Sequence, residues 1–67
     1  MVKNDRLTER EKDVIILLIE GFSNKQIARK LALSESTVSS HIMNIFLKLG
    51  VNNRAHAVAV VLKENIV

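Results

Sequence analysis

The chain has 67 residues, which suits one compact domain and excludes a second. It contains no cysteine, so neither disulfides nor a thiolate zinc site can stabilise it, and its apolar residues, 48% of the total, must form the core. The net charge of +3 favours a polyanionic partner but is far below a histone-like excess.

The first helix is predicted over residues 9–20. Thr8 and Glu11 have the spacing of a capping box, in which each side chain accepts a hydrogen bond from the other's backbone N–H. Gly21 stands where a left-handed C-cap belongs. No apolar run of the chain, Val14–Ile19 among them, is longer than six residues, far fewer than the roughly 20 that cross a bilayer. The start of the chain also lacks the features of a secretory signal, so we expect a cytoplasmic protein that does not contact the membrane.

A second capping box, at Ser23 and Gln26, begins a short helix that is expected over residues 24–31. Ser34 is the expected N-cap of a longer helix over residues 35–49. The apolar residues of the longer helix keep a three-four spacing up to Gly50 and are Val38, Ile42, Ile45, Phe46 and Leu49. Only two or three residues separate the two helices. So tight a connection is typical of a helix-turn-helix, whose second helix enters the major groove of duplex DNA.

Asn53 is the expected N-cap of a last helix, over residues 54–64. Val58, Val61 and Leu62 are predicted to form its inward face. The helix has more apolar residues than one buried face needs, and the surplus residues are Ala55, Ala59 and Val60. This surplus favours a weak two-fold contact with a second copy, while harmless exposure of small apolar residues is the alternative.

Residues 1–67 are therefore expected to form one all-α domain, a four-helix bundle that contains a helix-turn-helix. From about Leu7 to Val67 the chain resembles the LuxR/GerE family of helix-turn-helix DNA-binding domains, as found in the output domain of NarL/FixJ-like response regulators. The motifs that carry this resemblance recur in order at fixed separations, and they are Leu7–Glu11, Gly21–Ala28, Leu33–Val38, His41–Ile42, Asn44–Ile45, Lys48–Leu49 and Arg54–Val58.

The resemblance implies a bacterial transcriptional regulator that binds a specific sequence of double-stranded DNA. In the family, the third helix reads the major groove and the fourth supplies a homodimer contact on DNA. The domain is the C-terminal output of a response regulator or an autoinducer receptor in most relatives, and it stands alone in others. The resemblance implies neither a cofactor nor a small-molecule ligand for this domain.

By this resemblance, the base-facing positions of the third helix are Ser39, Ser40 and Met43. Relatives often carry Lys or Arg at the position of Ser39, whereas serine offers one short hydroxyl that can donate or accept. Met43 has a side chain suited to contact a thymine methyl group. The alternative for all three positions is solvated helix surface.

Phosphate contacts are expected from the starts of the second and third helices. Ser36 and Thr37 can donate to a phosphate, aided by the positive end of the helix dipole, although Thr37 could instead bond its own first turn. The resemblance places Asn24 and Lys25 at positions that clamp the DNA backbone, and Lys48 at the far end of the third helix, near the flanking strand.

Arg54 and the two histidines are the remaining candidate polar residues. Arg54 matches a characteristic family position, at which a DNA contact and a structural ion pair with a carboxylate such as Glu11 are both plausible. His41 and His56 lie on different helices with no further ligand by spacing, so we expect no metal site.

No phosphate loop, nucleophile elbow or triad pattern indicates an enzyme. A protein-protein interaction module is the competing function, because the third helix carries only one acidic and one basic residue.

Overall fold

The computed structural model describes residues 7–65. Within this range the chain forms four helices, α1 (Glu9–Ile19), α2 (Asn24–Leu31), α3 (Glu35–Leu49) and α4 (Arg54–Glu64), and no strand. The expected all-α class with four helices is confirmed, and α1 ends one residue earlier than predicted. The ends of the expected domain, residues 1–6 and 66–67, lie outside the described residues.

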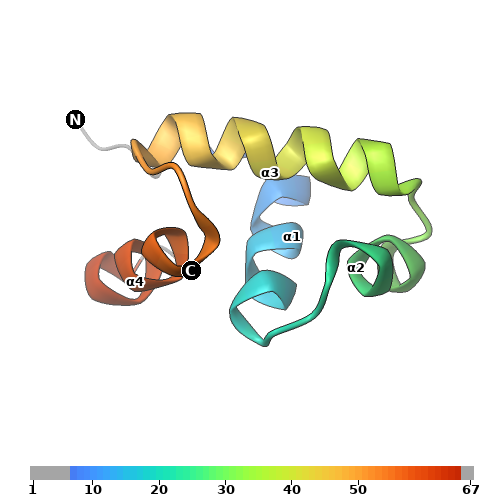
Figure 1. The fold of residues 1–67 in the computed structure, drawn as a ribbon, viewed down its shortest axis with the longest axis horizontal. Coiled ribbons are helices and arrows are strands. Elements are labelled where there is room, and N and C mark those ends of the chain that lie inside the picture. The colour runs from blue at the N-terminus through green and yellow to red at the C-terminus, as the bar shows by residue number, and fades with distance from the viewer. Residues whose placement is uncertain (1–6, 66–67) are drawn as a thin grey trace.

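The long helix α3 forms one side of the molecule, and the other three helices pack along its opposite side (Figure 1). In that view α1 crosses under the middle of α3, α2 lies under its N-terminal end, and α4 lies under its C-terminal end. The expected helix-turn-helix consists of α2, the short turn after it, and α3. This arrangement leaves the outer side of α3 uncovered over a length of about 22 Å.

The helices begin at the capping residues that the sequence indicated, which are Thr8, Ser23, Ser34 and Asn53. The first two form reciprocal capping boxes. The Thr8 hydroxyl accepts from the Glu11 N–H at 3.1 Å, and a Glu11 carboxylate oxygen accepts from the Thr8 N–H at 3.0 Å. Ser23 and Gln26 repeat this exchange at 3.2 and 2.8 Å. The caps satisfy backbone N–H groups that have no partner within a helix.

Three helices end in the same Schellman turn, in which a left-handed residue lets the next N–H donate back to the last helical turn. The left-handed residues are Gly21, Ala32 and Gly50, with φ angles of 94°, 57° and 72°. The N–H groups that donate back are those of Phe22, Leu33 and Val51, at 3.2, 2.9 and 3.0 Å. The turn of the helix-turn-helix is therefore the one of the three that uses alanine, whose Cβ disfavours this conformation.

The core takes apolar side chains from all four helices and from Leu7, which precedes the N-cap of α1. Its members are Leu7, Val14, Ile15, Leu18, Ile27, Ala28, Val38, Ile42, Ile45, Leu49, Ala57 and Val61. Four of them form the predicted three-four stripe of α3. Because this stripe faces the other three helices, it determines which side of α3 remains exposed.

The inward face of α4 differs from the predicted one. Ala57 and Val61 are buried, and Val58 and Val60 are half-buried against the core. Leu62, which we expected to face inward, is 62% exposed, so that prediction was wrong. Val60, which we expected on an outer side, packs against the core. The small side chain of Ala57 gives a weak hydrophobic signal in the sequence, yet it is at the centre of the buried face.

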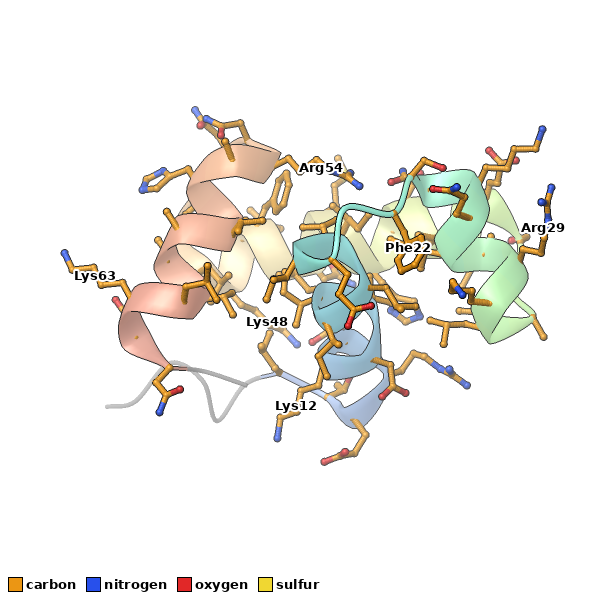
Figure 2. The ribbon with its side chains drawn as sticks, turned by 90° about the horizontal axis from the view of Figure 1, so that it is seen from below. Lys12, Phe22, Arg29, Lys48, Arg54 and Lys63 are labelled. Atoms are coloured by element: carbon orange, nitrogen blue, oxygen red, sulfur yellow. The ribbon has the colours of Figure 1, made fainter. Side chains whose placement is uncertain are left out.

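An ion pair joins the start of α1 to the end of α3. Glu11 is the only buried charged residue within the described range, at 3% exposure, and Lys48 donates to its Oε1 at 2.6 Å. Figure 2 shows the Lys48 side chain reaching toward α1. Burial raises the pKa of Glu11. Hydrogen bonds from Lys48 and the Thr8 N–H, together with the nearby charges of Lys48 and His41, lower this pKa by more than burial raises it. The net pKa of Glu11 lies below its ordinary value.

Replacing Ala32 by glycine should stabilise the domain. The left-handed conformation of Ala32 costs more than the extra freedom that glycine has in the unfolded chain, so we expect a gain of about 0.5–1 kcal/mol. Urea unfolding would measure it. The matched control is Ala59→Gly within α4, where the same change should instead destabilise by about 0.5–1 kcal/mol. A loss of stability in Ala32→Gly would contradict this account of the turn.

Replacing Lys48 by methionine should leave the buried Glu11 carboxylate without its cation. We expect the free energy of unfolding at pH 7 to fall by about 2–3 kcal/mol. The control is Lys12→Met, which breaks an exposed pair with Glu9 at 3.8 Å and should cost about 0.5 kcal/mol or less.

The same pair predicts a signed pH dependence. The lowered pKa of Glu11 stabilises the native protein above the unfolded pKa of about 4.3, and this contribution is lost as the pH falls through the lower folded value. In Lys48→Met, burial then dominates and raises the pKa of Glu11, so protonation favours the folded state. Unfolding experiments from pH 7 to pH 3 should therefore show the two proteins converging in stability. A constant difference between them would contradict the assignment.

Candidate nucleic-acid interface

The uncovered side of α3 carries one row of exposed side chains, Ser36, Ser40, Met43 and Leu47, at the three-four spacing of a single helix face. This row lies opposite the buried stripe of the same helix. Met43 is 66% and Leu47 is 78% exposed. The predicted base-facing residues Ser40 and Met43 therefore share this face, and Ser39 lies at its edge beside α2. Leu47 was not among the predicted reading residues, although it follows Met43 by four positions and belongs to the same face.

The N-terminus of α3 holds three exposed hydroxyl groups, and that of Ser34 contacts the other two. The Ser34 hydroxyl donates to that of Thr37 at 2.8 Å and lies 3.2 Å from that of Ser36. Ser34 also accepts from the Thr37 N–H at 3.1 Å. Thr37 therefore bonds within its own first turn, which was the alternative to a phosphate contact. Because the Thr37 oxygen accepts from Ser34, its own proton still points elsewhere and can be donated to an anion at this positive helix end.

The starts of α2 and α4 meet the edge of α3 in a chain of hydrogen bonds. Asn24 donates through Nδ2 to the Ser39 hydroxyl at 3.3 Å, and Arg54 donates to the Asn24 Oδ1 at 3.4 Å. The second guanidinium nitrogen of Arg54 donates to the Phe22 carbonyl. Figure 2 shows Arg54 at the side of α4 that faces Phe22 and α2. The structure thus decides against the pairing of Arg54 with Glu11.

The basic residues of α2 and α3 lie in different surroundings. Lys25, Arg29 and Lys30 are exposed on α2, and the Lys30 ammonium lies 4.6 Å from the centre of the Phe22 ring. Lys48, expected at a phosphate, is instead half-buried in its ion pair on the inner side of α3. This structural role for Lys48 depends on a partner 37 residues away along the chain.

The outer side of α4 carries its own exposed apolar row. Ala55, Ala59 and Leu62 have the spacing of one helix face and lie opposite the buried Ala57 and Val61. Ala55 and Ala59, two of the three residues expected at a dimer contact, therefore share an exposed face. This face continues to Leu62 and does not include Val60, which is half-buried.

The described part of the chain offers neither a cluster of possible metal ligands nor a single membrane-spanning helix. His41 is half-buried, His56 is exposed, and within residues 7–65 no group of three or more possible ligands could hold a metal ion. No single helix there is long and apolar enough to cross a membrane; only α3 and α4 taken together pass that test, and they are bent by 57°.

Comparisons with known proteins agree with the resemblance seen in the motifs. The family model for "Bacterial regulatory proteins, luxR family" matches residues 5–61. The transcription factor GerE superposes with a TM-score of 0.82 at 40% identity, over 90% of each chain. The response regulator ChrA of a heme-sensing two-component system superposes with a TM-score of 0.88 at 39% identity, over 91% of this chain. The chain spans only 30% of the length of that regulator.

Proposed function

Because the chain belongs to the luxR family of bacterial regulatory proteins, which are DNA-binding transcription regulators and not enzymes, we propose that it binds a specific duplex sequence as two copies. The observation that carries this proposal is the free outer face of α3. This face runs along the longest helix of the described fold, and α2 lies across its N-terminal end (Figure 1). Such a helix can enter the major groove while α2 contacts the DNA backbone.

The proposed base-reading residues are Ser39, Ser40 and Met43, which lie on or beside this face. All are in the middle of α3, where a helix inserted from its N-terminal half comes close to the bases. Serine hydroxyls can hydrogen-bond base edges, and the Met43 side chain can contact a thymine methyl group. These contacts would provide sequence preference, while the backbone contacts fix the register.

The proposed phosphate contacts come from the starts of α2 and α3, and they are Asn24, Lys25, Ser36 and Thr37. We leave Lys48 out of this set. Moving its ammonium to a phosphate would break a 2.6 Å bond to a carboxylate that is 3% exposed. A buried carboxylate without its cation costs about 2–3 kcal/mol, which is more than one solvated phosphate contact returns.

We propose that two copies meet on DNA through the exposed row of α4, formed by Ala55, Ala59 and Leu62. The row replaces the seam that included Val60, since Val60 packs against the core. Its small side chains allow two α4 helices to approach closely around a two-fold axis. The contact is too small to hold two free copies together, so we expect dimers to form when DNA aligns them.

The whole regulator would work in the cytoplasm, where it has access to the chromosome. ChrA is a response regulator of about three times this length, whereas GerE has about the same length, so both arrangements occur among proteins that are similar to this chain. We propose that the chain is the DNA-binding output of such a regulator or acts alone.

A protein-protein interaction module is the second candidate, because Met43 and Leu47 expose apolar surface on the outer face of α3. The two functions differ in their response to polyanions. A DNA-binding domain should be retained on heparin at low salt and should enrich a defined motif from a random DNA pool, whereas the second candidate predicts neither. Selection from such a pool therefore tests the proposed function directly.

Lys25→Ala should weaken DNA binding at low salt without changing the selected motif. Each neutralised phosphate contributes about 0.9 to the slope of log affinity against log salt concentration, so we expect the slope to decrease by about one. The matched control is Lys63→Ala, which removes the same charge from the last turn of α4, far from α2 (Figure 2). Titrations at several salt concentrations would measure both slopes. Equal slopes in the two variants would remove Lys25 from the phosphate contacts.

Leu62→Glu should abolish cooperative binding to DNA with two half-sites and leave the affinity for one half-site within a few-fold. The new charge lies on the exposed row of α4, where two copies would desolvate or repel it, and the fold should tolerate it. Val60→Glu is the contrasting variant, since a charge against the core should lower the melting temperature. If folded Leu62→Glu still binds two half-sites cooperatively, α4 does not form the dimer contact.

A further inference from the structure

Three helices contribute to one directed chain of polar contacts. Arg54 at the start of α4 donates to the Oδ1 of Asn24, at the start of α2. Asn24 in turn donates through Nδ2 to the Ser39 hydroxyl, on the edge of the outer face of α3. Arg54 is itself held by the Phe22 carbonyl, which accepts from its other terminal nitrogen. A residue of the proposed reading surface is therefore connected through hydrogen bonds to a residue that lies away from it.

The chemistry of these groups allows one direction only. A guanidinium has donors and no acceptor, so the Asn24 group that faces Arg54 must be its carbonyl oxygen. The amide nitrogen of Asn24 then necessarily faces Ser39 and occupies a lone pair of the Ser39 hydroxyl oxygen. The hydroxyl proton is directed away from Asn24, and within residues 7–65 it has no acceptor.

We propose that Arg54 and Asn24 are positioning residues that present Ser39 to DNA as a hydrogen-bond donor. This inference rests on the proposed function. A free serine hydroxyl rotates and can donate or accept, so it distinguishes base edges poorly. With its proton directed outward, Ser39 favours an acceptor edge, best supplied by the O6 and N7 of guanine, over the amino group of cytosine. The second amide hydrogen of Asn24 is still available for a phosphate.

The decisive variant is Asn24→Asp, which keeps the shape of the side chain but reverses the direction of the hydrogen bond with Ser39. A carboxylate accepts from Arg54 and can also only accept from Ser39, so the serine proton turns inward and lone pairs face the DNA. We expect the motif selected from random DNA to change at a single base pair. Preference there should move from guanine toward a base that donates, cytosine or adenine, by about threefold or more, as for one hydrogen bond.

Two controls separate this effect from the added charge and from general damage. Gln26→Glu places the same charge on the first turn of α2 and keeps the capping box, so it can lower affinity but should leave the motif unchanged. Ser39→Ala removes the group that is being oriented. In that background, Asn24→Asp should have no further effect on base preference. Arg54→Lys, which still offers only donors, should retain the wild-type preference if the protein remains folded.

The outcomes distinguish the two proposals. If the wild-type domain selects no motif, the proposed function fails and this inference fails with it. If the wild type selects a motif and Asn24→Asp leaves it unchanged, or changes it equally with and without the Ser39 hydroxyl, only the positioning role is overturned. A change at one base pair that requires Ser39 supports it. Circular dichroism and a thermal melt establish that each variant is folded before its motif is compared.

Discussion

The buried stripe of α3 is the constraint on which the rest of this structure depends. Four side chains, Val38, Ile42, Ile45 and Leu49, face one side of the helix, and the other three helices gather on that side. In a chain of 67 residues there is too little apolar surface to cover both sides of a 15-residue helix. Packing α3 on one side only therefore stabilises the fold and, by the same geometry, exposes a helix face that can enter a groove.

Ion pairs in the described part of the chain fall into two kinds with different energies, one between α1 and α3 and the other within α1. In the pair between Glu11 and Lys48 the carboxylate is buried, so breaking the pair leaves a buried charge and costs about 2–3 kcal/mol. The pair between Arg10 and Asp13 is exposed, at 3.6 Å, and contributes about 0.5 kcal/mol or less. This difference explains why Lys48, near the end of α3, belongs to the fold, while Lys25 is available to a partner.

The proposed reading surface is unusual in relying on short or uncharged side chains. Serines at positions 39 and 40 reach less far than lysine or arginine would, so each contact contributes little, and its direction matters more than its strength. Weak binding to a single half-site would be consistent with the proposed assembly of two copies on DNA through the small residues of α4. The fold links these features, because Arg54 begins the same helix that carries the exposed Ala55, Ala59 and Leu62.

The helices, their caps and the stripe of α3 could be predicted from the sequence, because they depend on residues three or four apart. Thr8 and Glu11, for example, are close in any chain that starts a helix there. The contacts of Lys48 and Arg54 could not be predicted in this way, because their partners are 37 and 32 residues away along the chain. Several carboxylates and carbonyls would have suited them equally. The facing of α4 also required the tertiary structure. Nearly every side of that helix is apolar, so only the fit of the small Ala57 against the other helices decides that Val60 turns inward and Leu62 outward.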